Sequence, residues 1–290
     1  MALYSIRPHE PLTAPALIAA FDGWVDAGGV ATTAASFIAE GGDVLAAFDT
    51  DALVDYRARR PTLDIQDGVL REMTWPELTV RRVRAGSRDI LVFTGPEPDY
   101  RWRAFRAAIV EMSLELGVVE SVCLGAIPAT VAHTRPTPIL MTGKDRRPLD
   151  TDPPLPAEHM RVPAAAVNLI ELHLSEHGIP SVGIWAQVPH YVAGMYQGGV
   201  LALVQRVEAH LGVSLSVEAL VEAAREERER LDAIVAERPD AREYLAQLEE
   251  AEPPRPIPSG EDIAAEVERF LQDWSGERPN PFENPPPEPG

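Results

Sequence analysis

The chain has 290 residues and a hydrophobic content of 45%, enough to bury the core of one large domain with or without an appendage. Its formal net charge of -19 argues against nucleic acid and anionic membranes as partners, because both would repel it, and we attribute the acidity mainly to solubility. The single cysteine, Cys123, rules out an intrachain disulfide framework, and no leader or membrane-spanning run is evident, so we expect a cytoplasmic protein.

The first half of the chain alternates apolar runs with helical patterns, and glycine or proline separates most of them. Pro76 and Gly86 punctuate two strand-like segments that together predict a hairpin. In chain order, the expected elements are a strand at 17–21, a helix at 30–38, a strand at 43–49, a hairpin of 68–75 with 78–85, a strand at 88–95, a helix at 100–116 and a strand at 119–127.

The second half opens with an irregular stretch at 128–163, and a loop of this length in a compact domain is usually functional or disordered. From 216 onward the sequence becomes charged and helical, with a break at Pro239. The expected elements are a helix at 164–177, a strand at 181–188, a helix at 198–211, two helices within 216–250 and a last short helix at 261–276.

Strands that alternate with helices predict an α/β fold. We expect a three-layer sandwich with a largely parallel, mixed sheet and a helical appendage at the C-terminus. The expected division is an α/β domain at 1–212, a helical region at 213–275 and a proline-rich tail at 276–290. The tail cannot build a core, so we expect it to be disordered.

The turn after the first buried strand resembles a nucleotide-binding turn without matching one. Its glycines stand at 23, 28 and 29, which is not the spacing of the dinucleotide fingerprint. Asp22 and Asp26 flank the following helix and would repel a phosphate, and Asp26 is placed to cap that helix. We therefore expect no tight binding of ATP or NAD, and no cofactor.

Four loops that follow predicted strands are rich in aromatic and charged residues. Parallel strands place such loops along one edge of a sheet, where α/β proteins form their sites. The edge is either a pocket or an ordinary polar rim, in which Arg101 and Arg135 offset nearby carboxylates such as Asp26 and Glu97. The candidate pocket or interface residues are Trp24, Asp26, Glu97, Arg101, Trp102, His133, Arg135, His190 and Tyr191.

Metal binding and covalent catalysis have little support in the sequence. His133 and His190 belong to no metal-binding motif, and we interpret His173 and His177, four residues apart, as ordinary helix residues, so we expect no metal. There is no nucleophile elbow, and Cys123 lies inside an apolar run. Acid–base catalysis by His133 and His190 stays open, although the sequence shows no nucleophile.

The same four loops carry a family resemblance. The segments GWVDAGG, GPEPDYRWRAF, LGAIPATVAHTRP and WAQVPHYV, followed by the charged helices, resemble the actinobacterial branch of the PAC2 (proteasome assembly chaperone 2) family. The resemblance implies an α/β sandwich and a non-catalytic interaction protein of the cytosol. It also implies a homo-oligomer, with a trimer preferred, and proteasome subunits as partners, since eukaryotic members help to assemble proteasome α-rings.

The alternative implied by older assignments within the family is a small-molecule enzyme that uses the loop edge, either an ATP-grasp-type carboxylate–amine ligase or a hydrolase. No catalytic residues carry over, because the family offers no settled set. Two departures matter. The glycine-rich segment that opens a helix in many relatives is HMRVPAAAVNLIE here, and the chain ends in Pro-Glu-Pro-Gly instead of a hydrophobic–Tyr–any docking tail.

Overall fold

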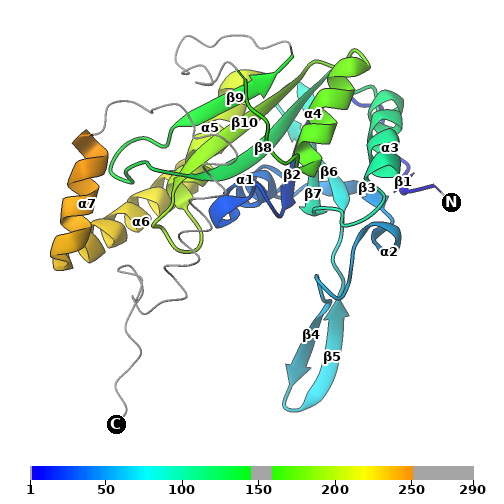
Figure 1. Cartoon of the computed structure of the whole chain (residues 1–290). Helices are drawn as coiled ribbons and strands as arrows, with labels where there is room; N and C mark the ends of the chain where they lie inside the picture. The colour runs from blue at the N-terminus through cyan, green and yellow to red at the C-terminus, as the bar shows by residue number, and fades with distance from the viewer. Residues whose placement is uncertain (1, 145–158, 251–290) are drawn as a thin grey trace.

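An eight-stranded mixed sheet organises residues 2–144 and 159–250, the part of the chain that the computed structural model describes (Figure 1). The four central strands β7, β2, β8 and β10 are parallel, and the outer strands pair antiparallel. In spatial order the strands are β1 (Tyr4–Ile6), β3 (Asp43–Phe48), β6 (Thr79–Ala85), β7 (Arg88–Pro96), β2 (Ala16–Asp22), β8 (Glu120–Ala129), β10 (Ser181–Pro189) and β9 (Ile139–Gly143).

The central strands contain long apolar runs because helices cover both faces of the sheet. Along β2, Leu17, Ala19 and Phe21 belong to one core cluster, and Ala16, Ile18 and Ala20 belong to the other. This split follows from the two-residue period of a strand. The continuous apolar run at 16–21 therefore serves two cores at once.

Helices form the layers on either side of this sheet, which confirms the predicted three-layer α/β fold (Figure 1). One core includes buried residues of α3 and α4, and the other includes buried residues of α1 and α5. The short α2 and the 3₁₀ helix η1 lie in the connections. The bounds are η1 (Ala27–Gly29), α1 (Val30–Ile38), α2 (Thr50–Leu53), α3 (Trp102–Glu115), α4 (Ala166–Glu176) and α5 (Gln197–Leu211).

Two further helices, α6 (Glu218–Glu237) and α7 (Pro239–Glu250), follow α5 and meet at the predicted break. Leu220, Leu231 and Val235 are the buried apolar residues of α6, which packs along α5. The predicted helix at 261–276 and the proline-rich tail lie outside the described residues. Within the described residues, no helix combines the length and apolar character needed to cross a bilayer.

The predicted pairing of the hairpin is wrong. Segment β5 (Val69–Thr74) pairs with β4 (Thr62–Gln66), while β6 enters the main sheet between β3 and β7. Asp67 and Gly68 form the turn with φ values of 53° and 78°, and two positive φ angles suit a two-residue hairpin turn. The β4–β5 hairpin projects away from the sheet and its helices (Figure 1).

The long irregular stretch after β8 also differs from its prediction. Strand β9 lies within it and pairs antiparallel with β10 at the edge of the sheet. Before β9, residues 130–138 cross the C-terminal end of β8 and reach the helices α5 and α6, where they line a groove. The stretch therefore supplies both a strand and part of the candidate site.

Candidate functional site

The N-terminus of α1 is closed by a carboxylate of the chain itself. Asp26 Oδ1 accepts the backbone N–H groups of Ala31 and Thr32, at 2.7 and 3.2 Å, and its other oxygen accepts the Thr32 hydroxyl. The expected capping role of Asp26 is confirmed, although Gly29 occupies the N-cap position itself. Burial raises the pKa of Asp26, against the effect of these hydrogen bonds. An anion at this helix end would have to displace Asp26.

Two more helix ends along the same edge are closed in the same way. Glu97 Oε1 accepts the backbone N–H of Ala166, the first residue of α4, at 2.6 Å. Glu227 Oε2 reaches from α6 to the N-terminus of α5, where it accepts the N–H groups of Gln197 and Gly198 at 2.6 and 3.3 Å. Carboxylates therefore occupy the positions at which phosphate groups bind to helix N-termini in other α/β proteins.

The expected charge compensation by arginine is wrong. Backbone N–H groups satisfy Asp26 and Glu97, and within the described residues neither carboxylate forms an ion pair with Arg101 or Arg135. Arg135 instead donates to the backbone carbonyl of Glu249, near the end of α7. Its guanidinium therefore helps to hold α7 against the edge.

His133 lies at the centre of a buried polar network. Its side chain has no exposed area, its Nδ1 lies 2.8 Å from the Tyr191 hydroxyl, and its Nε2 lies 3.2 Å from Asp232 Oδ1. The same hydroxyl accepts the backbone N–H of His133 at 2.8 Å. For a neutral imidazole, one proton arrangement satisfies all three contacts: Tyr191 donates to Nδ1, and Nε2–H donates to Asp232.

The pKa shifts of His133 and Tyr191 favour a structural role for this network. Burial lowers the pKa of His133 despite the opposing charge of Asp232, so the imidazole is neutral near pH 7. Burial also raises the pKa of Tyr191 to about 12, so its hydroxyl keeps its proton. The network joins the loop after β8, the end of β10 and α6. Each group is already held by a partner from another element.

The second histidine of the edge contacts α7. His190 Nδ1 lies 3.2 Å from the carbonyl oxygen of Ala129, and its Nε2 lies 3.0 Å from the Tyr244 hydroxyl. The rings of His190, Tyr191 and Tyr244 pack edge to face, with centroids 5.6 to 6.2 Å apart. Asp232 and Tyr244 are partners that the sequence reasoning missed. Tyr244 is the only aromatic residue in 216–250, a signal that could have found it, whereas Asp232 stands among many acids.

The remaining candidate residues follow β2 and β7, on the other half of the edge. Trp24 is 61% exposed. Trp102 donates its indole N–H to the carbonyl of Pro98 at 2.6 Å, and Arg101 precedes α3 with a φ of 56°. The described contacts bring His133, Arg135, His190 and Tyr191 together through α6 and α7. They do not join Trp24, Arg101 or Trp102 to that group.

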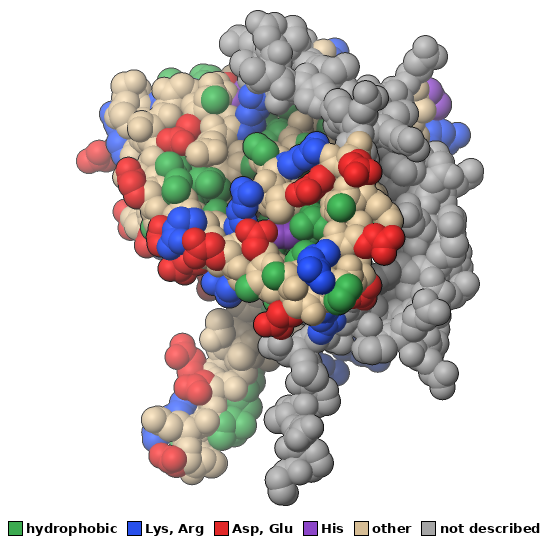
Figure 2. Space-filling view, turned by 90° about the vertical axis from the view of Figure 1, so that its left-hand side faces the viewer, with side chains coloured by type: hydrophobic (Ala, Val, Ile, Leu, Met, Phe, Trp, Pro, Cys, Tyr) green, Lys and Arg blue, Asp and Glu red, His purple; other side chains and the backbone are tan. Residues whose placement is uncertain are grey.

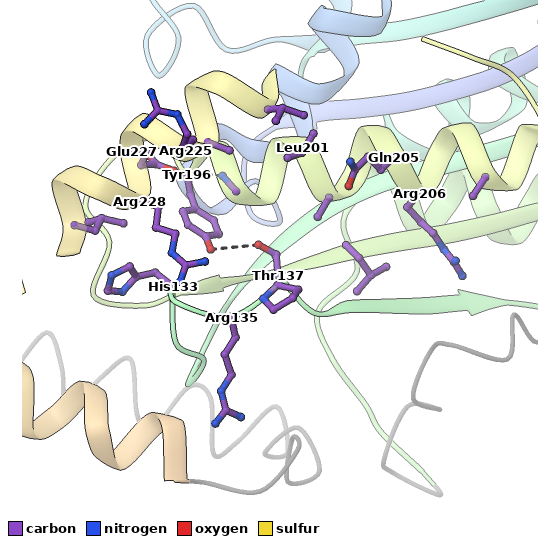
Figure 3. A pocket seen from close by; sticks show the side chains of 18 residues that line it. His133, Arg135, Thr137, Tyr196, Leu201, Gln205, Arg206, Arg225, Glu227 and Arg228 are labelled. Atoms are coloured by element: carbon purple, nitrogen blue, oxygen red, sulfur yellow. Dashed lines mark hydrogen bonds between the residues drawn. The ribbon is translucent and has the colours of Figure 1, made fainter. Parts of the chain in front are cut away.

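A groove of about 630 Å³ lies between α5, α6 and the segment that follows β8 (Figure 3). Its walls combine apolar and small side chains with several polar ones. The polar lining residues are His133, Arg135, Thr137, Tyr196, Gln205, Arg206, Arg225, Glu227 and Arg228. The groove therefore shares two of the residues predicted for the edge.

The part of the chain that the structure describes contains neither a cluster suited to a metal ion nor a reactive thiol. There, no group of three or more His, Cys, Asp or Glu side chains is arranged to hold a metal ion. Cys123 is fully buried, and burial together with the nearby Glu171 carboxylate raises the pKa of its thiol well above the usual value. A thiol of this kind is a poor nucleophile.

Comparison with protein families matches residues 20–235 to the PAC2 family. Among solved structures, a Corynebacterium glutamicum protein of unknown function is 30% identical, with a TM-score of 0.78 and coverage of 92% of this chain and 99% of that one. A PAC2 family protein from Streptomyces avermitilis is 33% identical, with a TM-score of 0.71 and coverage of 79% and 99%. A proteasome-assembly chaperone homologue from Mycobacterium tuberculosis is 30% identical, with a TM-score of 0.72 and coverage of 79% and 99%.

Comparison with curated proteins finds no match. The family match and the three actinobacterial structures agree with the resemblance carried by the four loops. They also agree with the observed sheet and helix layers. The chain belongs to the PAC2 family.

Proposed function

We propose that this chain is a non-catalytic interaction protein of the cytosol, similar in role to a proteasome assembly chaperone. It associates with copies of itself, as a trimer, and engages proteasome subunits. The description of the Mycobacterium tuberculosis relative as a proteasome-assembly chaperone homologue supports the role. The observation that carries the interaction function is the projecting β4–β5 hairpin.

The hairpin has one apolar face that the other described residues, 2–144 and 159–250, leave uncovered. Leu63 pairs with Met73 and Ile65 pairs with Leu70, so all four side chains lie on one face. They are between 40% and 66% exposed. Figure 2 shows hydrophobic side chains gathered along one side of this projection and acidic ones along the other.

A β-bulge creates this face. The register shifts between Asp64, which pairs with Glu72, and Ile65, which pairs with Leu70, so Arg71 has no cross-strand partner. Without the register shift, Ile65 would pair with Arg71, and Leu70 would point to the face opposite Met73. An isolated two-stranded hairpin is marginally stable in water, so this arm gains most from a partner.

We propose that a second copy of the chain covers the apolar face of this hairpin arm. The four paired side chains, with Trp75 beside them, expose on the order of 500 Å² of apolar surface, a size at which an exposed patch is often functional. In a cyclic trimer each copy gives one arm and receives another, so each arm contact buries roughly 1,000 Å² over both copies, the lower limit expected of a specific interface. The four side chains of the apolar face carry no charge, so two acidic copies can meet there without repulsion between like charges.

The closed helix ends support a non-catalytic role. An ATP-grasp-type ligase needs positions that accept phosphate groups, and carboxylates occupy the N-termini of α1, α4 and α5. His133 is likewise committed to Tyr191 and Asp232. The edge offers neither an open anion site at these helices nor an uncommitted buried base.

Light scattering tests the oligomer. We expect wild type at micromolar concentration to show the mass of a trimer, and the double variant Ile65→Asp, Leu70→Asp to be monomeric with a circular dichroism spectrum that shows the fold is kept. The matched control, Asp64→Asn with Glu72→Gln, alters the polar face and keeps the trimer. A monomeric wild type contradicts the oligomer, and a trimeric Ile65→Asp, Leu70→Asp variant contradicts the role of the arm.

A pull-down from native lysate tests the partner. We expect wild type to retain proteasome α-subunits, and a thermal-shift screen of nucleotides to show no stabilisation. Stabilisation by ATP without capture of α-subunits would favour the ligase alternative and contradict the chaperone role.

A further inference from the structure

The groove between α5 and α6 carries charge opposite to that of the whole chain. Four arginines and one acidic residue line it, whereas the chain has 45 acidic and 26 basic residues. We propose that this groove binds an organic carboxylate with an apolar body. This inference goes beyond the proposed interaction function and does not depend on it.

The acidic residue of the lining does not offset these arginines. Both backbone N–H groups that Glu227 binds belong to the first turn of α5, so its charge is engaged by the end of that helix. Arg225, in contrast, is already neutralised, because it forms ion pairs with Glu222 and Glu229. The positive charge that faces Tyr196 and Thr137 therefore comes from Arg228 (Figure 3).

Arg228 is the residue placed to receive a carboxylate. In Figure 3 its guanidinium points toward the same space as the side chains of Tyr196 and Thr137, and the Thr137 hydroxyl donates to the Tyr196 hydroxyl at 3.2 Å. The positive charge of Arg228 adds to the burial that lowers the pKa of His133 and opposes the burial that raises the pKa of Tyr196, which places Arg228 close to both. Its contact with Asp232 is long, 3.9 Å, and involves Nε.

A carboxylate fits this arrangement better than a phosphate. The terminal guanidinium nitrogens can donate to both oxygens of a carboxylate, and the two hydroxyl groups beside them add further hydrogen bonds. A phosphate dianion would bring a second negative charge close to Asp232, at an energetic cost. The head group that the site favours is therefore a monoanion.

The rest of the groove suits an apolar body. Leu201, Ala202, Val221, Ala224 and Leu231 line it from α5 and α6. The alanines leave space between the helices, and the volume of about 630 Å³ is that of a small-molecule site. A chain of about ten carbons fits within this volume and matches the apolar lining.

Calorimetric titration of the full chain with decanoate tests the proposal. We expect decanoate to bind at least tenfold more tightly than decanol and more tightly than decyl phosphate. Arg228→Gln should abolish the preference for decanoate over decanol. Arg225→Gln is the matched control one helical turn away, and it should leave the preference intact because Arg225 is already paired.

A second variant tests the location. Ala202→Phe fills the apolar part of the groove and should weaken decanoate binding at least tenfold, with circular dichroism confirming that the fold is kept. Three results would overturn the proposal: wild type that fails to bind decanoate, equal binding of decanol and decanoate, or equal losses in Arg228→Gln and Arg225→Gln.

Discussion

Replacing Tyr191 with Phe removes one oxygen atom from the network around His133 and keeps the aromatic ring. That oxygen accepts the backbone N–H of His133 at 2.8 Å and lies 2.8 Å from Nδ1. The ring contacts with His133, His190 and Tyr244 stay possible, because they depend on the ring and not on the hydroxyl. The substitution therefore removes these two hydrogen bonds and keeps the ring contacts.

The expected loss of stability follows from the burial of both groups. An unsatisfied buried polar group costs about 1–3 kcal/mol, so losing the acceptor of the N–H and the donor to Nδ1 should lower the free energy of unfolding by about 2–4 kcal/mol. Tyr244→Phe is the matched control. It removes an exposed hydrogen bond to His190 and should cost about 1 kcal/mol or less.

Urea unfolding followed by circular dichroism measures both losses, and hydrogen exchange locates them. We expect Tyr191→Phe to increase exchange in α6 and α7, because the network attaches α6 to the loop after β8. If the two variants lose the same free energy of unfolding within about 0.5 kcal/mol, the hydroxyl of Tyr191 does not attach α6 to the loop after β8. That result would contradict the structural role of the network.

Three further predictions use the same measurements. Folding lowers the pKa of His133, so the neutral imidazole contributes its full stability above pH 6.5, and this stability is lost as the pH falls toward the pKa of the folded state. In urea titrations between pH 7 and 5, His133→Gln should therefore lose less free energy of unfolding with falling pH than wild type does. Asp26→Ala should lower the free energy of unfolding by about 1–2 kcal/mol, and Asp26→Asn by less, because the amide oxygen still accepts from α1. Gly125→Ala would place a methyl group 2.2 Å from the ring of Trp185, so we expect a loss of about 1–3 kcal/mol, and an unchanged melting temperature would contradict the packing.

The sequence predicted the layers of the fold because its signals are local. Apolar runs alternate with helical periods up to α5, and Pro239 divides the last two helices as expected. The hairpin failed because three strand-like segments follow one another, and any neighbouring pair could form it. The turn at Asp67 and Gly68 favours the pairing of β4 with β5, because both residues adopt positive φ.

The site was harder to predict because half of it comes from α6 and α7. His133, His190 and Tyr191 follow parallel strands, so topology places them along one edge. Which acids of α6 face that edge depends on the rotation of the helix against α5, which charge pattern alone does not determine. Asp232 and Glu227 were therefore missed, although they hold His133 and the end of α5.

The glycines of the first turn explain why this turn resembles a nucleotide site without being one. Gly28 and Gly29 both have a φ of 62°. A methyl group on Gly28 would lie 2.8 Å from the backbone oxygen of Gly194, whereas one on Gly29 would meet nothing closer than 3.9 Å. The close approach that glycine permits at 28 is thus to the loop after β10 of the same chain, where a nucleotide-binding turn would approach a phosphate.

Comparing Gly28→Ala with Gly29→Ala separates these effects. Both variants force alanine into the left-handed region, at a cost of about 1 kcal/mol. Only Gly28→Ala also drives a methyl group against a backbone carbonyl, which adds about 1–3 kcal/mol because backbone cannot move aside as a side chain can. Urea unfolding should therefore rank Gly28→Ala as the less stable variant. Equal stabilities would show that the loop after β10 yields freely, and the glycine at 28 would then need another explanation.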